Sequence, residues 1–168
     1  PGHVRIARQF FAQFRHSQHF SIDIKDPAAA EGLVADAVSE NIDLSRVWLC
    51  SPSMDVLRGL RTRHCEVRLV HSTRVSRLQQ STEMHCALLA REGIDALNLH
   101  HSEWSGGLVT LVHRFGVHAF AWDIQQQDTM VNILRMGMDA VYSDHSDMMS
   151  ATLRADLQAR KLSGTGSS

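Results

Sequence analysis

The stretch Arg114–Asp123, RFGVHAFAWD, decides the fold class because it joins a helix end, a strand and a polar strand end. Gly116 adopts the left-handed backbone conformation at little cost, so it ends the helix and returns the chain toward a sheet. The apolar run that follows favours a buried strand. The same arrangement recurs at Gly93 and Gly137. The repetition predicts a series of βα units.

Six short apolar or β-branched runs alternate with segments of helical periodicity, and their onsets lie roughly 20 to 30 residues apart. The runs cover residues 20–25, 47–51, 67–71, 96–100, 117–123 and 140–144. Parallel strands with this spacing form either an open doubly wound sheet or most of a (β/α)₈ barrel. No glycine-rich dinucleotide motif or phosphate loop follows any run, which weakens nucleotide-binding alternatives.

The helical segments carry start signals and apolar stripes. Asp26 and Pro27 predict a helix start, because Asp is a good N-cap and Pro suits the first helical position. The helix that follows has one apolar stripe, formed by Leu33, Val34, Ala37 and Val38. A second helix contains Leu57 and Leu60, and a third is expected over Leu78–Glu92.

Length and composition limit the classes of protein. The 168 residues fit one domain, expected over 1–162, with a flexible polar tail over 163–168. A net charge of −1 with scattered charges argues against a nucleic-acid partner, and no apolar run is long enough for a transmembrane segment. The chain starts at Pro1 without a signal peptide, so we expect an internal part of a cytoplasmic protein. The oligomeric state is not indicated.

The cysteines and histidines show no familiar metal motif. Cys50, Cys65 and Cys86 are odd in number and lack CxxC spacing, so we expect reduced cysteines in the core. The eleven histidines include no HExxH pattern. Because neighbouring strand residues point to opposite faces, His100 and His101 are expected to make a poor chelating pair.

Lys25 is one of only two lysines, against fifteen arginines, and it ends an apolar run two residues after Asp23. Strand alternation places Ser21, Asp23 and Lys25 on one face, with Asp23 and Lys25 roughly 7 Å apart. This pair has two interpretations: an anion and metal site, or a structural ion pair on a solvated edge strand.

Polar residues stand at every expected strand end, where ligands bind in both candidate architectures. Ser51 and Asp144 are binding candidates that could instead cap the following helices. Trp122 offers a flat wall for a small alcohol or headgroup, although an alternating Trp is more often part of a core. A strand-end Asp suits Mg²⁺ or Ca²⁺, and a neighbouring Lys suits phosphate.

The order of five segments resembles the glycerophosphodiester phosphodiesterases over nearly the whole chain. They are Ile22–Lys25 (IDIK), Val47–Ser51 (VWLCS), Leu57–Arg61 (LRGLR), Gly116–Gln125 (GVHAFAWDIQ) and Gly137–His145 (GMDAVYSDH). The last two are similar to that family's Gly…Trp-Thr-Val-Asn strand and its closing Gly-Val-Asp-Gly-Ile-x-Thr-Asp-x-Pro. This resemblance, rather than periodicity, selects the barrel.

The resemblance implies an α/β fold, a partial TIM-type (β/α)₈ barrel that supplies strands three to eight with their helices. It implies hydrolysis of glycerophosphodiesters to glycerol 3-phosphate and an alcohol, with Mg²⁺ or Ca²⁺ as cofactor. Lys25 matches the phosphate-binding lysine, and Asp23 falls at a metal-binding Glu of the family. Trp122 matches a Trp that packs on the substrate alcohol, and Ser51 lies at the substrate pocket.

The chain also departs from the family pattern. Pro52 follows Ser51 where the family prefers Phe, Ser143 replaces Thr, and Gln125 replaces Asn. The His-Arg-Gly, Glu-x-Asp and His-Asp motifs, which carry the family's acid, base and remaining metal ligands, have no match, so no catalytic residue is assigned. We therefore expect an incomplete, inactive fragment of an active hydrolase. The alternatives are a non-catalytic phosphate-binding relative and a phospholipase-D-like headgroup hydrolase.

Overall fold

The computed structural model describes residues 2–14 and 18–164, over which helices and strands alternate. The helices are α1 Gly2–Phe14, α2 Ala29–Ser39, α3 Met54–Arg63, α4 Thr82–Arg91, α5 Gly106–Arg114, α6 Gln127–Arg135 and α7 Ser146–Gly164. The strands are β1 Phe20–Asp23, β2 Val47–Ser51, β3 Arg68–Ser72, β4 Ala96–His100, β5 His118–Trp122 and β6 Ala140–Val141.

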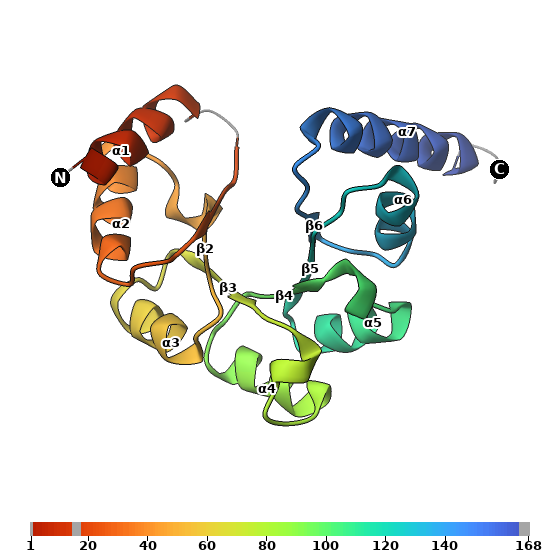
Figure 1. Cartoon of the computed structure of the whole chain (residues 1–168), viewed down its shortest axis with the longest axis horizontal. Helices are drawn as coiled ribbons and strands as arrows, with labels where there is room; N and C mark the ends of the chain where they lie inside the picture. Colours follow the sequence, from red (N-terminus) through yellow and green to blue (C-terminus); the bar gives the residue numbers. More distant parts are fainter. Residues whose placement is uncertain (1, 15–17, 165–168) are drawn as a thin grey trace.

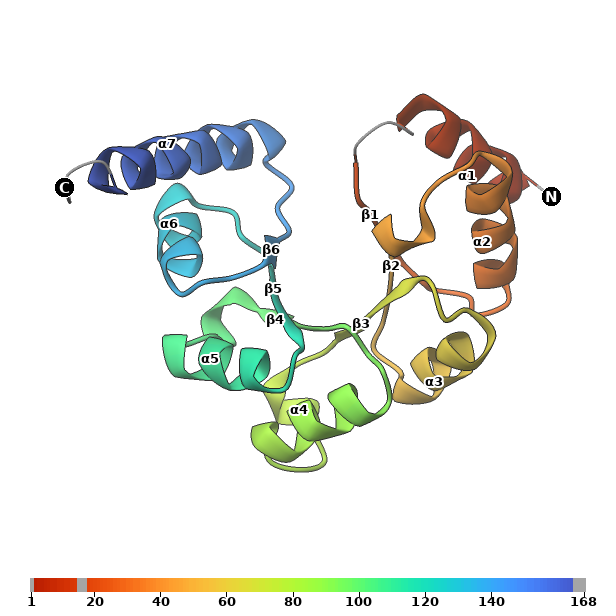
Figure 2. The same cartoon turned by 180° about the vertical axis from the view of Figure 1, so that it is seen from behind.

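The strands form one parallel sheet in the order β1-β2-β3-β4-β5-β6, curled into an open arc with the helices on its outside (Figure 1). Seen from behind, the opening lies between the first units, α1 and β1, and the last, β6 and α7 (Figure 2). This arrangement confirms an α/β fold with part of a TIM-type barrel. The numbering of the strands as three to eight stays a prediction.

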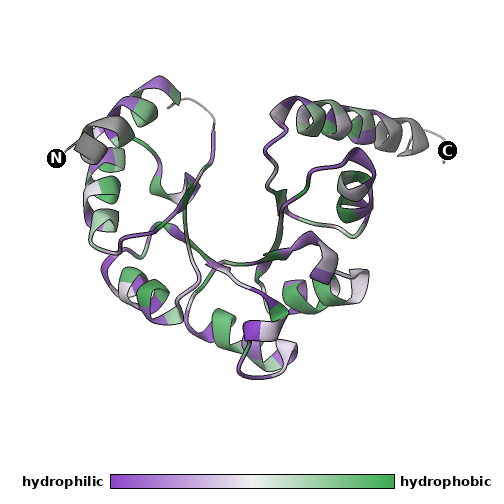
Figure 3. Cartoon of the chain, in the orientation of Figure 1, coloured by the Kyte–Doolittle hydropathy of each residue, from purple (hydrophilic) through white to green (hydrophobic). Residues whose placement is uncertain are grey.

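Two apolar layers hold the arc together. The larger layer lies between the sheet and the helices, where Leu49, Leu69 and Leu97 are fully buried. The helices carry both hydrophobic and hydrophilic residues, as expected for elements with one buried face (Figure 3). A smaller cluster around Val70 and Phe120 fills the concave side of the sheet. The strands therefore bury side chains on both faces, as parallel strands of a barrel do.

The glycine junctions confirm the expected helix endings. Gly93, Gly116 and Gly137 have φ values of 67°, 70° and 88°, in the left-handed region. Each follows a helix, α4, α5 and α6 respectively, and each precedes a strand. A side chain would be strained in this conformation, which explains why the sequence places glycine there.

Three helix details differ from the expectation. Helix α4 begins at Thr82 rather than Leu78, because Ser81 Oγ accepts the Met84 N–H and caps it there. Val38 is 56% exposed, since it lies beyond the edge of the stripe that buries Val34. Helix α2 begins only at Ala29, and the Asp26 carboxylate instead accepts the Ala28 N–H in the preceding turn.

The two edges of the arc are joined by side chains across its concave side. Ser21 Oγ of β1 lies 2.7 Å from the Tyr142 hydroxyl, which directly follows β6. Cys50 Sγ of β2 lies 3.3 Å from the same Ser21 oxygen. Burial is the main reason why the pKa of Tyr142 is raised, so its hydroxyl keeps the proton that it can donate. This network restrains the open ends of the sheet.

Other expectations concern the cysteines and the chain ends. Cys50 and Cys86 are buried and free, whereas Cys65 is exposed after α3 and so is not part of the core. Helix α7 continues to Gly164, and residues 165–168 of the expected tail lie outside the described residues. Within the described ranges, none of the helices has the length and apolar character needed to cross a bilayer.

Candidate functional site

The carboxyl ends of the six strands form one rim of the arc, which we call the mouth. Asp23 and Lys25 lie there at β1 and form an ion pair, with 51% and 86% of their side chains exposed. The alternation expected from the sequence holds, because Phe20 and Ile24 are buried on the opposite face. The two candidates that the sequence predicted for metal and phosphate therefore lie side by side.

The described residues supply only part of a site for a hard divalent ion. Mg²⁺ and Ca²⁺ take six or more oxygen ligands, usually from several carboxylates. Asp23 belongs to no group of three metal-ligating side chains within residues 2–14 and 18–164. Its carboxylate is instead paired with Lys25. Asp23 thus fits as one ligand of such an ion, and these residues do not complete the coordination.

Trp122 lies at the end of β5 against charged and aromatic neighbours. The Arg74 guanidinium lies 4.7 Å from the centre of its ring, and the His100 ring meets it edge-on at 4.8 Å. Within the described ranges, its buried indole N–H has no acceptor. Trp122 also lines a pocket of about 450 Å³ that reaches Ser143 and Asp144 at β6. Trp122 and the residues that follow β6 therefore line one pocket.

Ser51 is placed differently from the other candidates. It is 2% exposed at the end of β2, and its hydroxyl accepts the Ser53 N–H at 3.2 Å. The cap of α3 is Ser53, whose Oγ accepts the Val56 N–H. Ser51 therefore holds the loop before that cap, and its role in substrate binding stays a prediction.

A chain of hydrogen bonds links β4, β5 and β6 at the mouth. His100 Nε2 lies 3.1 Å from Asp123 Oδ2, and Gln125 Nε2 donates to Asp123 Oδ1 at 3.1 Å and to Asp144 Oδ2 at 3.0 Å. Hydrogen bonds from Gln125, then from His100, lower the pKa of Asp123. His100 Nδ1 also accepts the Ser102 N–H, so both ring nitrogens are engaged.

The expectation that His100 and His101 make a poor chelating pair is wrong. Strand β4 ends at His100, and His101 begins a 3₁₀ helix, η3 His101–Glu103, so strand alternation does not apply to it. The ring centres lie 4.3 Å apart. Ligand atoms of His100, His101 and Asp123 lie within 4.8 Å of one another. Parallel pairing of His100 with Trp122 is the feature that brings Asp123 to them.

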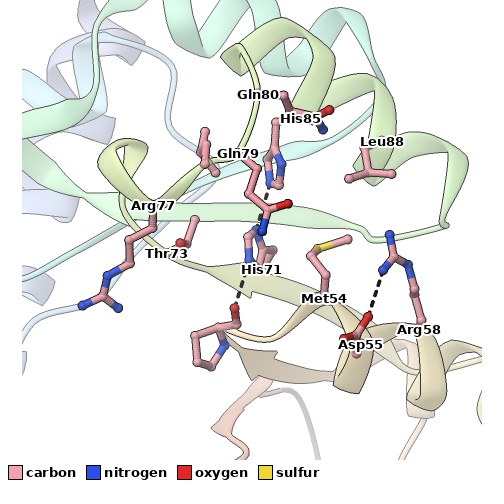
Figure 4. A pocket seen from close by; sticks show the side chains of 12 residues that line it. Met54, Asp55, Arg58, His71, Thr73, Arg77, Gln79, Gln80, His85 and Leu88 are labelled. Atoms are coloured by element: carbon pink, nitrogen blue, oxygen red, sulfur yellow. Dashed lines mark hydrogen bonds and ion pairs between the residues drawn. The ribbon is translucent and has the colours of Figure 1, made fainter.

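A second cleft, of about 450 Å³, lies outside the sheet between α3 and the β3–α4 connection (Figure 4). Two buried histidines stand in it, with His71 Nδ1 2.9 Å from His85 Nε2 and His71 Nε2 3.2 Å from the Pro52 carbonyl oxygen. The carbonyl can only accept, so His71 carries its proton on Nε2 and His85 donates to His71. Burial, followed by the charge of His85, lowers the pKa of His71 to about 4.

One family matches the sequence of the chain. Residues 14–148 match the profile of the Glycerophosphoryl diester phosphodiesterase family. No curated protein sequence matches significantly. The matched region contains β1 to β6 and the whole mouth.

Solved structures share the fold at low identity. A candidate glycerophosphoryl diester phosphodiesterase from Agrobacterium tumefaciens has a TM-score of 0.77 and 17% identity, over 90% of this chain and 64% of that one. One from Silicibacter pomeroyi gives 0.74 and 14%, over 90% and 56%. An Oleispira antarctica phosphodiesterase, in complex with the product sn-glycerol-3-phosphate, gives 0.61 and 15%, over 80% and 54%. The chain thus spans 54 to 64% of their lengths.

Proposed function

Because the chain belongs to the glycerophosphoryl diester phosphodiesterase family, we propose that it forms the larger part of a metal-dependent phosphodiester hydrolase. The reaction is cleavage of a glycerophosphodiester by water to glycerol 3-phosphate and an alcohol. The observation that carries this proposal is the Asp23–Lys25 pair at the carboxyl end of β1, where barrel enzymes bind their substrates.

In this proposal Lys25 binds a phosphate oxygen as a point charge. The Lys25 side chain is 86% exposed, and an exposed ion pair contributes little stability. A phosphate group can therefore replace Asp23 as the partner of Lys25 at little cost in free energy. Asp23 is then released to act as one ligand of Mg²⁺ or Ca²⁺. A bound divalent ion supplies Lewis-acid polarisation of the phosphoryl group.

The alcohol of the substrate would lie against Trp122. Asp144, which lines the same pocket as Trp122, is exposed, so the pocket is in contact with solvent. The Arg74 guanidinium over the indole adds a second positive charge near this wall. A polar alcohol or headgroup therefore suits the pocket better than a long apolar chain.

We also propose that these residues alone do not turn over substrate. General acid and base groups need a free proton site within reach of the substrate. The best-placed histidine, His100, has both nitrogens engaged, and Asp23 stands without two further metal-ligating partners in the described ranges. Further segments of a longer protein would supply the missing groups.

The test is binding of sn-glycerol 3-phosphate to the 168-residue chain in Mg²⁺ or Ca²⁺ buffer, measured by calorimetry. We expect Lys25→Ala to weaken binding at least tenfold, while Lys161→Ala, which removes the second lysine, has no effect. Equal binding by the wild type and Lys25→Ala would overturn the role of Lys25. Release of glycerol 3-phosphate from glycerophosphocholine by the chain alone would overturn the proposed inactivity.

Two observations favour a second function, that of a non-catalytic phosphate-binding relative. Both ring nitrogens of His100 are engaged, and the Asp23 carboxylate is paired with Lys25 and has no group of further metal ligands in the described ranges, which suits binding without chemistry. The longer protein distinguishes the two. If it releases glycerol 3-phosphate, the hydrolase is correct; if it binds glycerol 3-phosphate without turnover, the binding protein is correct.

A further inference from the structure

Three nitrogen and oxygen donors converge at the mouth on the side opposite β1. His100 ends β4, His101 begins η3, and Asp123 directly follows β5. Their ligand atoms all lie within 4.8 Å of one another, and His100 Nε2 is 3.1 Å from Asp123 Oδ2. A metal with bonds of about 2.0 to 2.1 Å holds neighbouring ligands roughly 3.3 Å apart, so small side-chain rotations complete the geometry.

The backbone of Asp123 aims its carboxylate at the histidines. In a continued strand, Asp123 would point to the face opposite Trp122 and His100. It has instead a φ of 65°, in the left-handed region that Asp tolerates better than most residues. This turn brings the carboxylate back to His100. A strained backbone that redirects a polar side chain is typical of a functional position.

Neighbouring side chains already orient these donors. Without metal, His100 Nδ1 accepts the Ser102 N–H and Nε2 donates to Asp123. When a metal replaces the proton on Nε2, the ring proton moves to Nδ1, where Ser102 Oγ at 2.8 Å accepts it. Gln125 donates to the other oxygen of Asp123 and ties it to Asp144. Such outer partners are found around bound metals, because they fix the ligand tautomers and orientations.

The donor types determine which metal fits, while one neighbouring charge opposes binding. The Arg74 guanidinium, which lies over the Trp122 ring beside His100, repels a bound cation. Two imidazoles with one carboxylate prefer a transition metal over Mg²⁺ or Ca²⁺, which prefer oxygen donors.

We propose that His100, His101 and Asp123 form a binding site for a first-row transition-metal ion such as Zn²⁺, with an open coordination position for water or a ligand. It is distinct from the ion expected at Asp23, since its donors lie at the end of β4, at the start of η3 and directly after β5 rather than at β1. The site holds whether or not the chain takes part in phosphodiester hydrolysis.

The test uses Co²⁺ as a spectroscopic probe on the untagged 168-residue chain. We expect visible d–d bands that saturate at one Co²⁺ per chain, that are lost when Zn²⁺ is added, and that persist in tenfold excess Mg²⁺. His101→Ala and Asp123→Asn should each weaken binding at least tenfold, and Gln125→Ala about tenfold through loss of orientation. Circular dichroism without metal verifies that each variant folds.

The matched control is His113→Ala. His113 is also bonded to an aspartate, with Nε2 2.8 Å from Asp139 Oδ2, but at the amino ends of the strands. We expect its Co²⁺ binding to equal that of the wild type, and Lys25→Ala likewise. The proposal is overturned if the wild type shows no saturable bands, if Mg²⁺ displaces Co²⁺ as well as Zn²⁺ does, or if folded His101→Ala and Asp123→Asn bind normally.

Discussion

The two rims of the arc use aspartates in opposite ways. At the amino ends of the strands, which we call the floor, Asp95 precedes β4 and accepts the Leu69 N–H of β3, and Asp139 precedes β6 and accepts the Ala119 N–H of β5. At the mouth, the partners of Asp23 and Asp123 within the described ranges are side chains, and about half of each aspartate side chain is exposed. The floor carboxylates join strands, whereas the mouth carboxylates are free to exchange partners.

The largest expected effect tests this contrast with one isosteric change at each rim. The Asp95 side chain is 15% exposed and binds Arg61 and Arg68 at 2.7 Å each. Asp95→Asn removes the negative charge that pairs with these two arginines. It also replaces one carboxylate oxygen with an NH₂ group, which cannot accept the Leu69 N–H. We expect the free energy of unfolding to fall by about 2 to 4 kcal/mol in urea titrations. Asp123→Asn should leave the urea midpoint unchanged. Equal losses in both variants would remove the distinction between the rims.

The second effect concerns a buried group near the mouth. The pKa of His71 is lowered to about 4, against about 6.5 for a free histidine, so between these values the unfolded chain binds more protons than the folded protein. Stability is therefore full above pH 6.5 and falls as the pH drops toward 4, by about 2 to 3 kcal/mol. Urea unfolding at a series of pH values measures this.

Burial also lowers the pKa of His85, which adds to the same trend. His71→Gln should flatten the dependence, while His145→Gln, which removes an exposed histidine, should preserve it. A wild-type stability that stays constant from pH 7 to pH 4.5 would contradict the buried neutral pair.

The third effect, the smallest of these, concerns the left-handed residues of the two rims. Gly116 at the floor has a φ of 70°, and an added Cβ would meet nothing within 4 Å, so strain alone determines the result. We expect Gly116→Ala to lower the free energy of unfolding by about 1 kcal/mol. No loss in thermal or urea unfolding would show that the floor tolerates strain as the mouth does at Asp123.

The sequence predicted the elements better than the site. Strands β2 and β4 begin and end where expected, and the three glycine junctions are confirmed, because these features depend on local patterns. The hydrogen bond between Ser21 and Tyr142 joins distant parts of the chain, which no local pattern reveals. His101 was misjudged because strand alternation was extended past the end of β4.

Asp23 and Lys25 lie next to each other and form an ion pair, one of the two interpretations that the sequence left open. Strand β1 ends at Asp23, so strand alternation does not determine the position of Lys25. The approach of Asp123 to His100 was not foreseen. It depends on a positive φ at a residue other than glycine, and the sequence gives no signal for that conformation.

The central claim, that the mouth binds a phosphate ligand and the floor does not, is tested most directly by the tryptophan indole N–H signals in ¹H–¹⁵N NMR spectra. Trp122 lies at the mouth without an acceptor in the described ranges, whereas the Trp48 indole near the floor donates to His19 and that of Trp104 donates to Phe120. On titration with sn-glycerol 3-phosphate and Mg²⁺, the account predicts that the Trp122 signal shifts while the other two stay fixed. A Trp48 shift with an unmoved Trp122 would contradict it.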